Sequence, residues 1–277
     1  MRTFIREKSF SRFNCKYKEV DWFEYSEEEK EAVKKPRQSR TRVSPPKIKN
    51  LNDEYSRKMF RWLFHNNFSA GDYLVTLTFA KIVDKKTAQK EFANYVKRLR
   101  RLYKRLGLEL KYLYVYEGRS GGARPHFHVV LNSGAGLNRD DIEKLWKLGL
   151  TQARLLQQDD DSGICASLCE YLAKEMKQAS KYERSWNCST NLVRPENVVD
   201  DNAVSRKRMR GVQEAQRNDE VKKYVERIYV GWTLISWYIG YNEITGRPFA
   251  RFRLVRKKKY GRYVRIYKRL CKKGKSP

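Results

Sequence analysis

The order of helical and strand-like segments between residues 51 and 178 restricts the fold more than any other feature of the sequence. Apolar residues recur at helical spacing in 52–68, 84–107, 138–148 and 162–178. Runs rich in β-branched and aromatic residues lie at 72–80, 110–118, 124–132 and 150–157. The resulting order is helix, β-α-β-β-α-β, helix. It predicts an α+β fold with a ferredoxin-like or RRM-like antiparallel sheet, two helices on one face and the last helix crossing the other.

Shifts in composition divide the chain into three parts. Residues 1–50 are polar and charged without clear periodicity and close on a stretch rich in proline and basic residues, so we expect a basic flexible arm without a core. Residues 51–180 hold the predicted α+β domain. Residues 181–277 are interpreted as a basic C-terminal extension, with short helical patches and a strand-like tail around the turn NEITGRP.

The charge of the chain narrows the choice of partner. With 61 Lys+Arg against 32 Asp+Glu, the formal charge is +29, which favours a polyanion, and the interleaved aromatic residues favour a nucleic acid. No apolar run approaches about 18 residues and the N-terminus lacks the apolar segment of a signal peptide, so we expect no membrane association. Five irregularly spaced cysteines indicate reduced thiols and a cytoplasmic location.

Basic residues gather near the end of the chain. The last 27 residues hold 13 Lys+Arg and no acid, together with aromatic residues, a mixture that can neutralise phosphates and stack on bases. A solvated strand face with a polar tail is the alternative interpretation. The candidate nucleic-acid-binding residues are Arg124, Arg206, Lys207, Arg208, Arg256, Lys257, Lys258 and Lys259.

Two of the three histidines stand one residue apart in a strand-like run, PHFHVVL. Successive strand residues point to opposite faces, so His126 and His128 share one face while Phe127 and its apolar neighbours share the other. Glu117 ends the preceding strand and can supply a third ligand, whose charge suits Mg²⁺ or Mn²⁺. An HxH pair also arises as two half-exposed polar residues on a sheet, so the metal site is a hypothesis.

The last predicted helix offers a nucleophile. Its apolar residues form one stripe at helical spacing, Tyr171 falls at the edge of that stripe, and Lys174 follows three residues later. An ammonium near a phenol favours the phenolate and can hold a phosphate. The alternative is a core tyrosine with its hydroxyl at the rim.

Three short stretches carry a resemblance. In this order, TLT at 76–78, PHFH at 125–128 and YLAK at 171–174 resemble the three motifs of the HUH endonucleases, the rolling-circle replication initiators of phages, plasmids and small single-stranded DNA viruses. RPHFH and the later NLVRP look closest to phage-type replication-associated proteins. The resemblance covers about residues 70–200.

The resemblance implies roles for the matching positions. His126, His128 and Glu117 would bind a divalent cation, and Tyr171 would attack a single-stranded DNA phosphodiester. The products would be a 5′-phosphotyrosine and a 3′-hydroxyl that a host polymerase can extend, with Lys174 positioning the DNA. This helix holds a single tyrosine of that kind, and Tyr182 is a weaker second candidate.

The partners follow from the same resemblance. Single-stranded DNA or an origin hairpin would be the substrate, and a host helicase would unwind DNA because no P-loop is present. Two alternatives stay open at this point: a relaxase or single-strand transposase of the same superfamily, and a nonenzymatic RRM-like binder. The second alternative would display aromatic residues on its open sheet face, where PHFH displays histidines.

Overall fold

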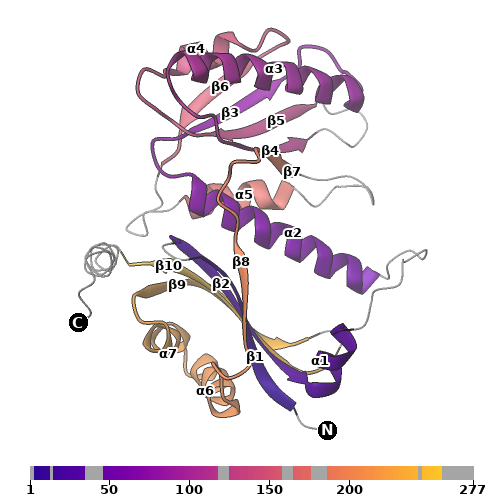
Figure 1. Ribbon diagram of the computed structural model, residues 1–277, viewed down its shortest axis with the longest axis vertical. Helices are drawn as coiled ribbons and strands as arrows, with labels where there is room; N and C mark the ends of the chain where they lie inside the picture. Colours follow the sequence, from indigo (N-terminus) through magenta and orange to yellow (C-terminus); the bar gives the residue numbers. More distant parts are fainter. Residues whose placement is uncertain are drawn as a thin grey trace. The chain divides into compact units, whose positions relative to one another are not determined.

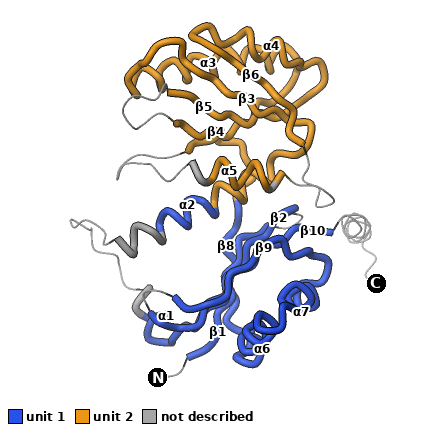
Figure 2. The backbone as a smooth tube through the Cα atoms, turned by 180° about the vertical axis from the view of Figure 1, so that it is seen from behind, with its two compact units in different colours: residues 1–58, 195–277 blue, residues 59–194 orange. Residues whose placement is uncertain are grey.

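The structure is a computed structural model that divides into two units, one formed by residues 1–58 and 195–277 (unit 1) and one by residues 59–194 (unit 2) (Figures 1 and 2). It describes residues 3–12, 15–34, 46–117, 125–157, 165–175, 186–242 and 245–257. Helix α2 (Pro46–Asn67) contributes its first part, through Lys58, to unit 1 and the rest to unit 2. In the described part of the chain, no helix combines the length and the apolar character needed to cross a membrane.

Unit 2 contains the predicted β-α-β-β-α-β order. Its elements are β3 (Tyr73–Thr78), α3 (Lys85–Arg105), β4 (Tyr112–Glu117), β5 (His126–Leu131), α4 (Arg139–Lys144), β6 (Thr151–Leu155), α5 (Ala166–Glu175) and β7 (Trp186–Cys188). The antiparallel sheet has the order β6-β3-β5-β4-β7. Strand β7 was not predicted; it pairs with β4 and extends the four-stranded ferredoxin-like arrangement by one edge strand.

Helix α3 forms where the sequence predicts it. The side chain of Asp84 accepts a hydrogen bond from the backbone N–H of Thr87 and caps the helix, and Gly107 follows its end with a positive φ of 67°. Its apolar stripe packs on the sheet face that carries Phe127 and Val129, and α4 contributes Ile142 to the same core.

Helix α5 lies on the other face of this sheet. It contacts β4, and Figure 1 shows it on the side of the sheet opposite α3. Leu113 and Val115 of β4 point to this face and are fully buried, as is Cys169 of α5. The α+β fold with the tyrosine-bearing helix across the second face is therefore confirmed.

Unit 1 joins the two ends of the chain in one sheet. Its elements besides α2 are β1 (Thr3–Ser11), β2 (Tyr17–Ser26), α1 (Glu27–Lys34), β8 (Glu196–Asp200), α6 (Arg206–Arg217), α7 (Val221–Ile228), β9 (Trp232–Tyr241) and β10 (Pro248–Arg256). All pairs are antiparallel, in the order β8-β1-β2-β10-β9. The strands predicted on either side of the NEITGRP turn are β9 and β10, whereas residues 258–277 of the predicted tail lie outside the described residues.

This sheet corrects the prediction of a flexible arm without a core over residues 1–50, as far as residues 3–34 are described. Val20 and Trp22 of β2 are fully buried, and the ring of Trp22 packs edge-on against Phe252 of β10 at 4.9 Å between centroids. The indole N–H of Trp22 donates to the hydroxyl of Tyr229 at 2.7 Å. The strands of the arm gain their core from strands near the other end of the chain, so they give no sign of burial in local sequence.

The C-terminal extension is corrected for the same reason. Residues 196–256 supply three of the five strands and two helices of unit 1, so this segment completes a domain with the N-terminal strands instead of extending unit 2. Helices α6 and α7 cover one face of the sheet, where Met209, Val212 and Val225 join the core. In Figure 2 the two ends of the chain share the colour of unit 1.

A buried ion pair ties α2 to unit 1. The Lys58 ammonium lies 2.8 Å from Asp21 Oδ2, and Arg251 Nε lies 2.8 Å from Asp21 Oδ1. Burial raises the pKa of Asp21, but the two cations outweigh it and hold the pKa below its ordinary value. The carboxylate is therefore ionised at neutral pH and links β2, β10 and α2.

Candidate metal centre and nucleophile

The structure brings together the three predicted metal ligands on β4 and β5. Glu117 pairs directly with His126 across the two strands, so the three side chains share the sheet face that α5 crosses. His126 Nε2 lies 2.6 Å from Glu117 Oε2, and His128 Nε2 lies 3.2 Å from Glu117 Oε1. One ligand atom from each residue lies within 4.8 Å of the others. This geometry lets one cation contact all three side chains.

The electrostatics of the cluster also fit a cation. Burial raises the pKa of Glu117, but hydrogen bonds and charge interactions with His126 and His128 lower it further, to about 2. Glu117 is therefore an anionic ligand at neutral pH. Among the described residues, Glu117 Oε1 and His128 Nε2 are buried without a well-aligned hydrogen-bond partner. A divalent cation would satisfy both atoms, since a carboxylate and neutral imidazoles are ordinary ligands of such ions.

Thr76 of β3 holds the second histidine from behind. It pairs with His128 across the strands, and its Oγ1 lies 3.2 Å from His128 Nδ1. When His128 binds a cation through Nε2, its Nδ1 carries the proton and donates it to the threonine oxygen. Such a partner fixes the tautomer and the orientation of a ligating imidazole. Thr76 lies in the TLT stretch, but its spacing alone did not predict this contact.

Replacing Thr76 by valine should raise the Mn²⁺ concentration needed for half-maximal binding by about 10- to 100-fold, because the orienting hydrogen bond is lost while the shape is kept. Titration of the purified protein with Mn²⁺, followed by electron paramagnetic resonance of the free ion, measures this. Thr76→Ser should retain most of the affinity. Thr78→Val is the matched control on the same strand face, and an equal loss in both valine variants would contradict the assigned contact.

Tyr171 lies beside the metal-ligand cluster. Its side chain is 48% exposed on α5, and its ring meets that of His128 edge-on, with 6.0 Å between centroids and 81° between planes. The next residue, Leu172, is buried and anchors the helix, so Tyr171 stays at the edge of the packed stripe as the sequence predicts. The phenol is therefore accessible to a substrate that contacts the cluster.

Other predicted residues of this site are placed less fully. Lys174 lies on α5, one turn after Tyr171, but its side chain is outside the described residues. Arg124 and Tyr182 also lie outside them, as does the loop at 118–124 between β4 and β5.

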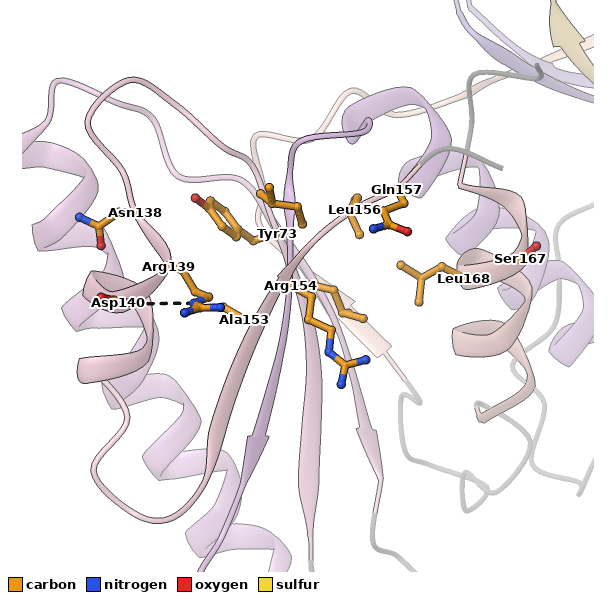
Figure 3. A pocket seen from close by; sticks show the side chains of 12 residues that line it. Tyr73, Asn138, Arg139, Asp140, Ala153, Arg154, Leu156, Gln157, Ser167 and Leu168 are labelled. Carbon is orange, nitrogen blue, oxygen red and sulfur yellow. Dashed lines mark ion pairs between the residues drawn. The ribbon is translucent and has the colours of Figure 1, made fainter. Parts of the chain in front are cut away.

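A pocket reaches around the edge strand β6. It has a volume of about 880 Å³ and is lined by residues of α4, β3, β6 and the start of α5. Figure 3 shows Arg139 and Asp140 on one side of β6 and Ser167 and Leu168 on the other. Arg154 is exposed, and its pairing with Leu74 places it on the sheet face of the metal ligands. Sequence reasoning did not single out Arg154, which stands alone in its strand.

The basic residues proposed for nucleic-acid binding in unit 1 have local partners. Arg206 donates to the backbone oxygen of Thr3 at 2.8 Å, and Arg208 donates to that of Ala203 at 2.6 Å. Lys257 Nζ lies 2.8 Å from Glu226 Oε2.

Two further basic residues of this group lie on β10 and α6. Arg256 donates from Nε to the backbone oxygen of Cys15 at 3.2 Å, and its guanidinium lies 4.9 Å from the centre of the Trp232 ring. Lys207 is exposed on α6, and Lys258 and Lys259 lie outside the described residues. DNA binding by this group of residues stays a prediction.

Comparison with known proteins bears on the segment that forms the cluster. Residues 72–178 match a family model that describes replication-associated proteins of the ORF2 type. The matched stretch begins just before β3 and contains Glu117, His126, His128 and Tyr171. No curated protein and no solved structure matches the chain. The family match supports a replication initiator protein, and a protein of that kind binds DNA.

Proposed function

We propose that the protein nicks and rejoins single-stranded DNA through a covalent link to Tyr171 and thereby initiates rolling-circle replication, as the HUH endonucleases do. The observation that carries this proposal is the place of Tyr171, whose ring lies 6.0 Å from that of a predicted metal ligand, His128. The family match to residues 72–178 supports the biological role.

The proposed reaction is a transesterification. The phenolic oxygen of Tyr171 forms a bond to the scissile phosphorus, the bond from phosphorus to the 3′ oxygen breaks, and that oxygen takes up a proton. A divalent cation, Mg²⁺ or Mn²⁺, held by Glu117, His126 and His128 would polarise the phosphate and stabilise its charge. Because the phosphotyrosine conserves the energy of the phosphodiester, attack by a 3′-hydroxyl rejoins the strand without ATP.

Neighbouring residues have supporting roles in this proposal. Lys174, one helical turn after Tyr171, would favour the phenolate and position the DNA. Arg154, exposed on the ligand face of β6, would bind a backbone phosphate of the strand as it approaches α5. A host polymerase would extend the 3′-hydroxyl.

A denaturing gel tests the proposal. Purified protein is incubated with labelled single-stranded hairpins whose loop and flanks are randomised, in Mn²⁺ and in EDTA. We expect a shifted band that needs Mn²⁺ and disappears on protease treatment. If the same pool binds on a native gel but gives no covalent band in Mn²⁺, the enzymatic proposal fails and a nonenzymatic binding protein takes its place.

A further inference from the structure

The sheet of unit 1 has two faces of different character. Val20, Trp22 and Phe252 point to the face that α6 and α7 cover, where they are fully buried. Residues one position away along each strand point to the opposite face. Tyr55 and Lys58 of α2 contact that second face at Phe10, with 5.4 Å between the ring centroids of Phe10 and Tyr55.

The rest of the second face carries a row of aromatic side chains from four adjacent strands, which we call the aromatic band. Its members are Phe4 of β1, Phe23 and Tyr25 of β2, Phe249 of β10 and Tyr238 of β9. Ring centroids are 6.1 Å apart for Phe4 and Tyr25, 5.9 Å for Phe23 and Tyr25, and 6.1 Å for Tyr238 and Phe249. Phe23 and Phe249 are direct partners across β2 and β10, so the row is continuous.

The band is accessible. Four of its members are partly exposed and Tyr238 is 53% exposed. A Cβ on Gly240 would meet the Tyr238 hydroxyl at 3.0 Å, so the tyrosine ring extends along the strand over Gly240. Gly240 therefore leaves room for this side chain to lie against the sheet.

Cations lie over the rings of the band. The Arg6 guanidinium is 3.8 Å from the centre of the Tyr25 ring, and that of Arg251 is 5.3 Å from the centre of the Phe249 ring. Asp201 holds Arg6 by a bidentate contact, and Asp21 holds Arg251. The guanidinium groups are therefore fixed against the rings, where they add cation–π attraction.

The charge of unit 1 matches a polyanion. Unit 1 contains 38 of the 61 Lys+Arg and 18 of the 32 Asp+Glu, a formal charge of +20 out of the chain's +29. Aromatic rings on an open sheet face, within a basic domain, are the usual means of binding unpaired bases. A duplex is a poor fit, because its bases are already stacked and present only their edges in the grooves.

We propose that the aromatic band binds unpaired bases of single-stranded DNA at a site separate from the metal centre. The choice of DNA rests on the proposed function, whereas base stacking rests on the band alone. Such a site would hold a stretch of single strand while another part of the strand is cut in unit 2. It would also give unit 1 a function that the family match, confined to residues 72–178, does not cover.

Paired leucine substitutions test the stacking. Tyr238→Leu combined with Phe249→Leu removes two rings and keeps apolar bulk and charge, and Trp237→Leu is the matched control, since Trp237 is 42% exposed on the opposite face. Binding of the full chain to a fluorescent thymidine 20-mer and to an abasic 20-mer of equal charge is measured in EDTA by anisotropy. We expect the double variant to bind the thymidine strand about 10- to 100-fold more weakly, with unchanged binding to the abasic strand.

Two outcomes would overturn the proposal: unchanged thymidine binding in the double variant, or an equal loss on the abasic strand. The salt dependence should be the same in all variants, because no phosphate contact is removed. Tighter binding of a uridine RNA than of the thymidine strand would contradict the choice of DNA. Because no metal is present, these results do not depend on whether the protein cuts DNA.

Crosslinking in the wild-type protein removes any dependence on the folding of variants. An oligonucleotide carrying 5-iododeoxyuridine is irradiated in the complex, and the linked peptides are mapped. We expect crosslinks in residues 3–26 or 232–257, in addition to any in unit 2. Crosslinks confined to residues 59–194 would overturn the second site.

Discussion

Replacement of Tyr171 by phenylalanine is expected to lower the rate of single-stranded DNA cleavage by at least about a thousandfold, because the attacking oxygen is lost. The ring and its edge-on contact with His128 are kept, so DNA affinity should change less than about twofold. Cleavage of a labelled hairpin under single-turnover conditions measures the first quantity, and native binding in EDTA measures the second.

Tyr182→Phe is the matched control for this substitution. Tyr182 is the second candidate nucleophile in the sequence, and its replacement should leave the first cleavage step at the wild-type rate. If Tyr171→Phe still cuts while Tyr182→Phe does not, the nucleophile has been assigned to the wrong tyrosine.

Replacement of His128 by alanine is expected to lower activity by at least about a hundredfold at 1 mM Mn²⁺, because one of three ligands is lost along with its link to Thr76. Activity should recover in part at high Mn²⁺ if weak metal affinity is the cause. Isothermal titration with Mn²⁺ should show the weaker binding directly.

His65→Gln controls for the loss of a histidine as such. His65 is the remaining histidine of the chain and lies buried on α2, on a different element from the cluster. This variant should keep the Mn²⁺ requirement of the wild type. Equal Mn²⁺ requirements for His128→Ala and the wild type would contradict the metal site.

The sequence predicted unit 2 well because its signals are local. Alternation in PHFHVVL determines which side chains share a face, and a short β-hairpin brings Glu117 opposite His126. The helical stripe around Leu172 likewise places Tyr171 at its edge. Each of these relations spans only a few residues, or a single connection between neighbouring strands.

Unit 1 could not be predicted in the same way. Strand β2 pairs with β10, more than 220 residues later, and the pattern of β1 and β2 alone looks like a charged arm. Asp21 shows the difficulty, since an acid in a polar segment turns out to be buried between Lys58 and Arg251. The aromatic band was missed for the same reason, because its rings come together only when both ends of the chain form one sheet.

The contact of Thr76 with His128 lies between these two cases. The order of the strands determines that β3 and β5 are neighbours, but which residues pair depends on the register. A fold prediction that included register would have found it. The exposed Arg154 on β6 required the same information.

The measurement that decides the proposed chemistry most directly is mass spectrometry of the DNA-linked peptide. The wild-type protein is incubated with a cleavable hairpin in Mn²⁺, digested with nuclease and protease, and the nucleotide-bearing peptide is sequenced. We predict a single nucleotide attached to Tyr171 through its 5′-phosphate, with a free 3′-hydroxyl on the released strand. Attachment to another residue, or cleavage that leaves a free 5′-phosphate and no linked peptide, would contradict the proposed phosphotyrosine mechanism.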